Sequence, residues 1–207
     1  ALESKIISFR TTGITPRMFQ YQIVKRAKEH KKHIVLPEGD DDRILLAADA
    51  LVKQNVVDLT ILGNKDNVLA ALKRLNLSLD PEKVKIINPA TSDRYPVYVE
   101  TLVDLRKSKN LSLQMARDLM LDVSYFGTMM VYKGEADGMV SGAAHTTQHT
   151  IRPALQFVKT KPGIATVSSV FFMCLPNRVS IFGDCAVNPN PTSEQLADIA
   201  ISSAETS

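Results

Sequence analysis

The stretch HIVLPEGDDDRILLAADALVKQNVVDLTIL, residues 33–62, decides the fold. It opens with a short apolar run that Pro37 ends, and three acidic residues, 40–42, follow. The next apolar residues recur at the spacing of one helix face, and this stripe consists of Ile44, Leu45, Ala48 and Leu51. A second apolar run, residues 56–62, is closed by Gly63 and Asn64. The stretch therefore predicts a strand, a helix and a second strand.

The same alternation continues along the chain. Thr15 and Pro16 are typical of a helix start, here a helix to about residue 29. Beyond residue 62 we expect helical segments at 66–75, 93–133 and 147–158 and strands at 84–87 and 138–141. Such alternation predicts α/β architecture, with a mostly parallel sheet and flanking helices in three layers.

After residues 162–163, Pro-Gly, the pattern changes. Two strand-like runs, 164–175 and 179–182, are separated by Pro176 and Asn177, and a last helix is expected at 193–204. We therefore expect a linker at residues 1–13, a first α/β domain at 14–160 and the opening part of a second α/β domain at 161–207.

Composition excludes several classes of protein. The net charge of +3 is small and dispersed, which argues against nucleic-acid binding. No apolar run approaches about 18 residues, and no basic segment followed by an apolar stretch opens the chain, so neither a membrane span nor a secretion signal is expected. The two cysteines, Cys174 and Cys185, lie in apolar or small surroundings without metal-site spacing, which favours a reducing, cytoplasmic compartment.

Residues 137–156, DGMVSGAAHTTQHTIRPALQ, read as a strand, a turn of small residues and a helix start. Helix starts present unpaired N–H groups and attract anions. Small residues at Gly142–Ala144 would allow a ligand close to the backbone, and the hydroxyls of Thr146, Thr147 and Thr150 would add donors. With the guanidinium of Arg152, which we expect to be buried, the stretch predicts a phosphate or carboxylate site.

Other residues admit a plainer explanation. Arg106 near a helix end is usually solvated, although it could point at the same anion. The acidic turn 38–42 could hold Mg²⁺, but helix capping is favoured. His145 and His149 have the spacing of zinc ligands, yet lack a third ligand, so His145 is better placed as a donor near the anion. Ser141 lacks the preceding glycine of a nucleophile elbow. We expect no metal site.

The pattern S-G-A-x-H-T-T-x-x-T-I-R-P at residues 141–153 resembles the phosphate acetyltransferase (phosphotransacetylase) family. Residues 34–40, 105–107, 168–173 and 182–189 extend the resemblance, which covers nearly everything from residue 14 onward. Residues 14–19, ITPRMF, resemble the long bacterial form, which carries further domains upstream.

The resemblance implies reversible acetyl transfer between CoA and inorganic phosphate. It also implies a homodimer and two α/β domains related in architecture to isocitrate and isopropylmalate dehydrogenases. CoA and acetyl-CoA enter as substrates, and no tightly bound cofactor is implied. The substrate-binding residues that the family pattern assigns to this chain are Arg106, Ser141, Gly142, His145, Thr146, Thr147, Thr150 and Arg152. The family's catalytic Asp and a Ser-Arg pair fall beyond Ser207, so the catalytic residues are not identified and the isolated chain is expected to have little or no activity.

Three alternatives remain open. One is an acetyl-CoA-sensing regulatory domain like that fused to some malic enzymes, which would not need the intact run 141–152. Phosphate butyryltransferase differs only in acyl-chain length, which the sequence does not determine. A dehydrogenase of related topology is less favoured because no G-x-G-x-x-G follows a strand.

Overall fold

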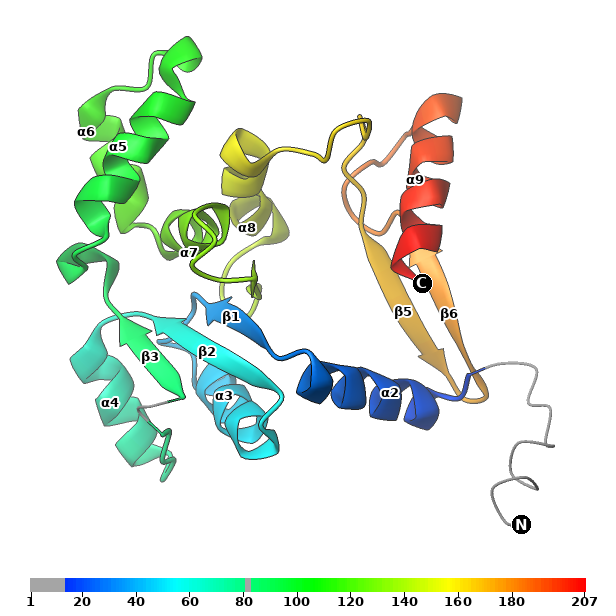
Figure 1. Ribbon diagram of the computed structural model, residues 1–207, viewed down its shortest axis with the longest axis horizontal. Coiled ribbons are helices and arrows are strands. Elements are labelled where there is room, and N and C mark those ends of the chain that lie inside the picture. Colours follow the sequence, from blue (N-terminus) through cyan, green and yellow to red (C-terminus); the bar gives the residue numbers. More distant parts are fainter. Residues whose placement is uncertain (1–13, 81–82) are drawn as a thin grey trace. The chain divides into compact units, whose positions relative to one another are not determined.

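A parallel four-stranded sheet lies at the centre of the larger part of the chain in the computed structural model, which describes residues 14–80 and 83–207 (Figure 1). The strands are β1 (Lys32–Leu36), β2 (Val57–Leu62), β3 (Val84–Ile87) and β4 (Gly138–Met139). Their order is β3-β2-β1-β4 and every neighbouring pair is parallel. The parallel sheet predicted from the alternation is therefore confirmed.

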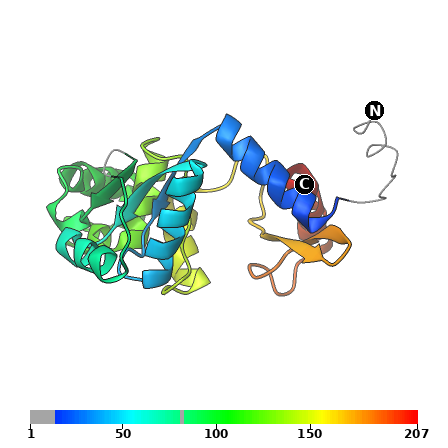
Figure 2. The same cartoon turned by 90° about the horizontal axis from the view of Figure 1, so that it is seen from below.

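Helices cover both faces of this sheet (Figure 2). Because successive side chains of a strand point to opposite faces, two separate apolar clusters form. One contains Leu59 and Ile61 of β2 with Leu45 of α3 (Asp42–Gln54) and Val68 of α4 (Lys65–Arg74). The other is contributed by the sheet, α5 (Tyr95–Leu105) and α7 (Val123–Tyr132), and contains Val35, Leu62, Tyr98, Leu102, Phe126 and Met129. These two clusters are the core that holds the strand ends in place.

The helices of this part begin mostly where the sequence predicts. Their bounds are α3 (Asp42–Gln54), α4 (Lys65–Arg74), α5 (Tyr95–Leu105), α6 (Leu113–Leu121), α7 (Val123–Tyr132) and α8 (Thr147–Pro153), with 3-10 turns η1 (Pro89–Thr91) and η2 (Lys107–Lys109). Asp41 caps α3 by accepting from the N–H of Arg43, and Ser112 caps α6 by accepting from Met115. The predicted helix 147–158 is α-helical only to Pro153, and a π-helical turn, η3 (Ala154–Val158), completes it.

The chain divides into two compact units. One is residues 27–159, and the other is residues 160–207 with the N-terminal residues up to Arg26, of which 14–26 are described. The division falls within helix α2 (Pro16–Glu29), whose first turn is capped by the hydroxyl of Thr15 as expected. The predicted linker, residues 1–13, lies outside the described residues, and the domain limits drawn from the sequence stay a prediction.

The second unit contains an antiparallel hairpin and a helix: β5 (Val170–Leu175), β6 (Arg178–Gly183) and α9 (Ser193–Thr206). The prediction of a strand from residue 164 is wrong for residues 164–169. The reason is that β6 ends at Gly183, which pairs with Val170, so no partner strand remains. Cys174 is exposed on β5 rather than in a core, and both cysteines are free.

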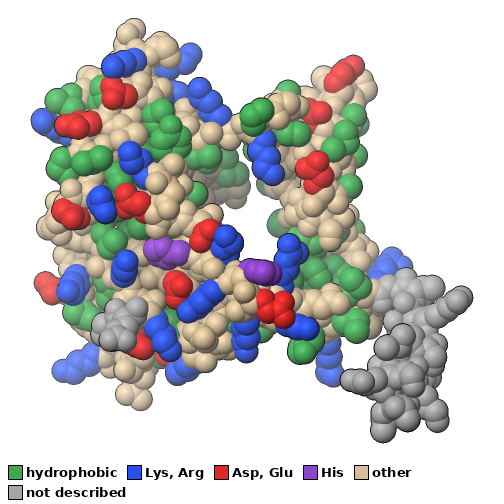
Figure 3. Space-filling view, viewed as in Figure 1, with side chains coloured by type: hydrophobic (Ala, Val, Ile, Leu, Met, Phe, Trp, Pro, Cys, Tyr) green, Lys and Arg blue, Asp and Glu red, His purple; other side chains and the backbone are tan. Residues whose placement is uncertain are grey.

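On the face drawn in Figure 3, Lys and Arg side chains are interspersed with Asp and Glu, and the described residues form no extended patch of one sign there. Within residues 14–80 and 83–207, none of the helices combines the length and apolarity that crossing a bilayer requires.

Candidate functional site

The predicted site lies beside β1, where the order in which successive strands are added to the sheet reverses. From β1 the chain moves outward through β2 and β3, and then returns to place β4 on the other side of β1. The loops that leave β1 and β4 therefore diverge at the carboxyl edge of the sheet, which is where ligands bind in open α/β folds. The loop after β1 carries Glu38, and the loop after β4 carries the turn of residues 142–145.

The carboxylate of Glu38 occupies this 142–145 turn. Oε2 accepts from the N–H groups of Gly142 at 3.0 Å and Ala143 at 2.9 Å. Oε1 accepts from the N–H groups of Ala144 and His145, both at 2.8 Å. The turn does bind an anion, but the anion is a side chain of the same molecule. The N–H groups of Gly142, Ala143 and Ala144 are therefore already engaged by Glu38, and the role of Gly142 in binding a ligand stays a prediction.

Glu38 is ionised in this position. Its side chain is only 1% exposed, and burial alone would raise its pKa. The hydrogen bonds from Ala144, Ala143 and His145 outweigh burial and lower the pKa of Glu38 to about 2. Arg43 adds a second tie between the two loops by donating to the carbonyl of Ala143. The turn is thus built around a fixed negative charge.

Two histidines stack beside this carboxylate. The rings of His145 and His149 lie 4.8 Å apart at 28°. Nδ1 of His145 lies 2.9 Å from Glu38 Oε1, and Nε2 of His149 lies 2.9 Å from Asp122 Oδ2. Each ring is thus engaged by its own carboxylate. Among residues 14–80 and 83–207, no cluster of three or more His, Cys, Asp or Glu side chains could hold a metal ion.

The predicted hydroxyls have separate roles. Thr146 caps α8, since its Oγ1 accepts from the N–H of His149 at 3.2 Å. Thr150 donates to Ser141 Oγ at 3.2 Å, which brings these two hydroxyls together. Thr147 is exposed on the first turn of α8. Of the predicted set, Thr150 and Ser141 form a pair, and Thr146 serves the helix.

The positive charges of Arg106 and Arg152 both affect the pKa of Tyr125. Arg106 is half-buried and donates from Nη1 to the carbonyl of Gln156 at 3.3 Å, and the hydroxyl of Tyr125 donates to Gln156 Oε1 at 3.1 Å. Burial raises the pKa of Tyr125, while the positive charges of Arg152 and Arg106 act in the opposite direction. In the part of the chain that the structure describes, neither guanidinium forms an ion pair. Neither positive charge is therefore neutralised by a carboxylate of the described residues, and the role of the two arginines in binding an anion stays a prediction.

Arg152 is exposed, so the prediction that it is buried is wrong. Helix geometry gives the reason, because Pro153 and Phe157 point to the buried side, as residues four apart do. An exposed guanidinium needs no internal partner. Tyr125, Gln156 and Glu38 were not expected at the site. The sequence predicts Tyr125 only as part of the helical segment 93–133.

The acidic turn after β1 serves α3. Asp41 caps the helix and pairs with Arg43, and Asp42 pairs with Arg74 at 2.6 Å. The capping interpretation is therefore confirmed, and these carboxylates already have cationic partners. A cavity of about 310 Å³ adjoins this turn and is lined by Pro37, Glu38, Asp40, Asp41, Val123, Ala144 and His145.

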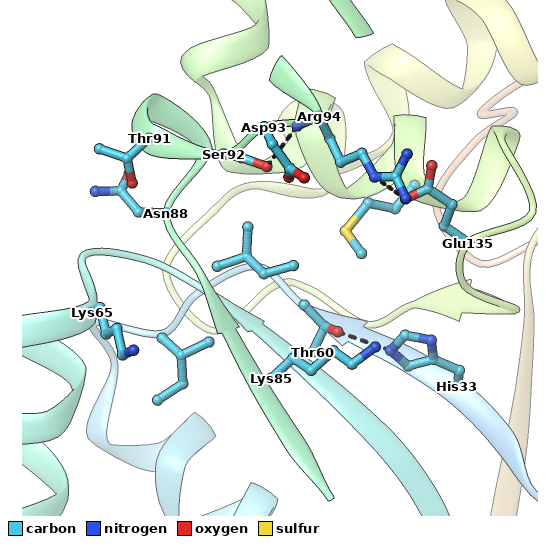
Figure 4. A pocket seen from close by; sticks show the side chains of 13 residues that line it. His33, Thr60, Lys65, Lys85, Asn88, Thr91, Ser92, Asp93, Arg94 and Glu135 are labelled. Carbon is cyan, nitrogen blue, oxygen red and sulfur yellow. Dashed lines mark hydrogen bonds and ion pairs between the residues drawn. The ribbon is translucent and has the colours of Figure 1, made fainter. Parts of the chain in front are cut away.

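A larger cavity, of about 680 Å³, contains none of the predicted site residues (Figure 4). It lies over the face of the sheet that carries His33, Thr60 and Lys85. Both signs of charge line it, and Arg94 lies 3.6 Å from Glu135. Its mixed lining does not indicate an anion, so the carboxyl edge between β1 and β4 remains the candidate site.

Comparison with known proteins shows which family the chain resembles. Residues 18–207 match the model of the family described as phosphate acetyl/butaryl transferase. A phosphate acetyltransferase of Synechocystis sp. is 55% identical over 199 residues, which cover 96% of this chain and 29% of that protein. The phosphotransacetylase structure from Streptococcus pyogenes superposes with a TM-score of 0.86 at 40% identity and covers 93% of this chain and 58% of that one. The EutD phosphotransacetylase from Staphylococcus aureus gives a TM-score of 0.80 at 43% identity, with 90% and 57% covered.

The chain thus spans between 29% and 58% of the length of these relatives. The match nevertheless takes in both compact units and every residue of the candidate site. On this ground the chain belongs to the phosphate acetyl/butaryl transferase family.

Proposed function

We propose that this chain carries the phosphate-binding part of an acyltransferase site that moves an acetyl group reversibly between CoA and inorganic phosphate. The observation that carries the proposal is the pair of guanidinium groups, Arg106 and Arg152, whose charges oppose the rise in the pKa of Tyr125 and which have no carboxylate partner among residues 14–80 and 83–207. Family membership supports the reaction. Acetyl-CoA, phosphate, acetyl phosphate and CoA are the ligands this site would take.

The proposed reaction requires groups that bind and orient phosphate, and arginine side chains can do both. A phosphate oxygen attacks the thioester carbonyl, the carbon–sulfur bond breaks, and the proton of hydrogen phosphate passes to the departing thiolate of CoA. Two forked guanidinium groups would orient the dianion and hold it beside the thioester. The paired hydroxyls of Ser141 and Thr150 would add donors to its oxygens. Nothing in this arrangement requires a metal ion.

Titration of the chain with inorganic phosphate tests the proposal. We expect saturable binding that weakens about tenfold or more in Arg152→Ala and in Arg106→Ala, as for the loss of a charge-assisted hydrogen bond. Arg117→Ala is the matched control, because Arg117 is an exposed arginine on α6 away from the site. Phosphate binding that is absent, or equal in all three variants, would contradict the proposal.

Titration with CoA separates the alternative of a sensor domain. Binding of CoA without phosphate binding, and without any effect of Arg152→Ala, would favour a regulatory acetyl-CoA-sensing domain. The family description covers both acetyl and butyryl transfer, so acyl-chain length is tested by comparing acetyl-CoA with butyryl-CoA as ligands. A homodimer is expected of the whole protein, and light scattering tests it.

A further inference from the structure

Glu38 is a buried carboxylate that the proposed transfer does not use directly. It accepts four backbone N–H groups from the 142–145 turn and a fifth bond from the ring of His145. The residues lie more than a hundred positions apart in the sequence, so this contact fixes one strand-end loop to another. These bonds hold the backbone of the 142–145 turn in one conformation.

The same contact determines where His145 carries its proton. An ionised carboxylate only accepts hydrogen bonds, so the Nδ1 atom that faces Glu38 must carry hydrogen. In the neutral imidazole the other nitrogen, Nε2, is then an acceptor. The side chain of His145 is 29% exposed, so the ring reaches solvent while Nδ1 stays engaged.

We propose that Glu38 is a positioning residue of the transfer site: it holds the 142–145 turn and keeps the proton of neutral His145 on Nδ1, so that Nε2 faces the substrate. The inference rests on the proposed function for the identity of the substrate. The position of the proton does not depend on it.

His149 supplies an internal reference with the opposite arrangement. Its Nε2 faces Asp122 Oδ2 at 2.9 Å, while Oδ1 of Asp122 accepts from the N–H groups of Ser124 and Tyr125. By the same reasoning the proton of neutral His149 lies on Nε2. Two stacked histidines of one chain should therefore show opposite tautomers.

Long-range ¹H–¹⁵N spectra of the histidine-labelled chain above the titration range of its histidines measure both tautomers without any substrate. The signals are assigned by their loss in His145→Asn and His149→Asn. We expect protonated Nδ1 and unprotonated Nε2 for His145, and the reverse for His149. Protonated Nε2 in neutral His145 would overturn the inference, and this result needs no variant of Glu38.

A substitution then tests the hold on the turn. In Glu38→Gln the amide has one acceptor oxygen for five donors, so at least two N–H groups lose their acceptor. We expect amide hydrogen exchange within residues 142–145 to accelerate about tenfold or more. Glu100→Gln, an exposed glutamate on α5, should leave these rates unchanged. Unchanged exchange in Glu38→Gln would also overturn the inference.

Phosphate titration of the same samples separates the two proposals. Binding reported by the side-chain signal of Arg152, together with a shift of His145 Nε2, supports both. A response of Arg152 without one at His145 Nε2 would refute the positioning of His145 and leave the proposed function standing. If neither signal responds, the proposed function fails, and the role of His145 toward substrate fails with it.

Discussion

Replacing Asp184 by Asn should weaken the smaller unit severely. Oδ1 of Asp184 accepts from the N–H of Ser169 at 3.0 Å and from its hydroxyl at 2.6 Å. Oδ2 accepts from the N–H of Val187 at 3.1 Å and from the backbone and side chain of Asn188 at 2.5 and 3.0 Å. Burial opposes the ionisation of Asp184, yet the bonds from Ser169 and Asn188 hold its pKa well below the usual range.

The expected magnitude follows from these donors. Asn keeps one acceptor oxygen and places an NH₂ group against either Ser169 or the Val187–Asn188 backbone. One or two N–H or O–H donors therefore lose their acceptor, and each such loss costs about 1–3 kcal/mol. We expect the free energy of unfolding of this unit to fall by about 2–4 kcal/mol. Because a unit of this size has little stability to lose, that is a large fraction of the whole.

Hydrogen exchange of the β5 and β6 amides, followed by NMR, measures this change. The chain contains no Trp, so NMR is preferred to intrinsic fluorescence. Glu205→Gln, on the exposed side of α9, is the matched control and should change the free energy of unfolding by less than about 0.5 kcal/mol. A loss below about 1 kcal/mol in Asp184→Asn would refute the reasoning, because the carboxylate would then not hold the loop.

Three further predictions concern residues 27–159. The pKa of Glu38 is lowered from its ordinary value of 4.5 to about 2, so ionised Glu38 stabilises the fold at pH values above 4.5 and this stabilisation is lost as the pH falls from about 4.5 toward 2. Urea unfolding at a series of pH values should show this loss, and in Glu38→Gln the free energy of unfolding should depend less on pH in this range. Gly39→Ala should lower the free energy of unfolding by about 1–3 kcal/mol, because the added Cβ would lie 2.5 Å from the carbonyl oxygen of Leu62. In Gly138→Ala the added Cβ meets only an ordinary contact at 3.4 Å, so this variant should have a clearly higher urea midpoint than Gly39→Ala. Leu45→Ala should cost about 2–5 kcal/mol and Leu46→Ala, 49% exposed, much less; equal thermal midpoints for the two would contradict the assigned core.

Local signals in the sequence predicted the fold well. Apolar periodicity located the strands of the parallel sheet and the helices between them, because burial of one face or stripe is encoded within a dozen residues. Helix caps were predicted for the same reason: Asp41 and Thr15 accept from N–H groups two and three residues away. The error at residues 164–169 came from the length of the partner strand, which apolar character alone does not report.

The candidate site was harder to predict because its defining contact is long-range. Residues 38–42 and 142–145 were both noted, the first as a cap or cation site and the second as a ligand site. Their mutual contact requires β1 and β4 to be neighbours in the sheet, and the local periodicity of apolar residues does not determine the order of the strands. An acidic residue after one strand and a turn of small residues after another are the signals that, with the strand order, would have predicted the pair.

The contact has a consequence for how an anion is held. Backbone N–H groups of a turn normally supply partial positive charge to a bound phosphate. Here the charge of Glu38 already neutralises that supply, so under the proposed function the compensation for a dianion at this edge comes from Arg106 and Arg152. Lysine would keep the charge but lose the fork of donors that fits a phosphate. Arg152→Lys should therefore retain part of the phosphate affinity and Arg152→Ala little of it. If both variants bound phosphate as tightly as the wild type, the dianion would have to be held by some group other than this arginine.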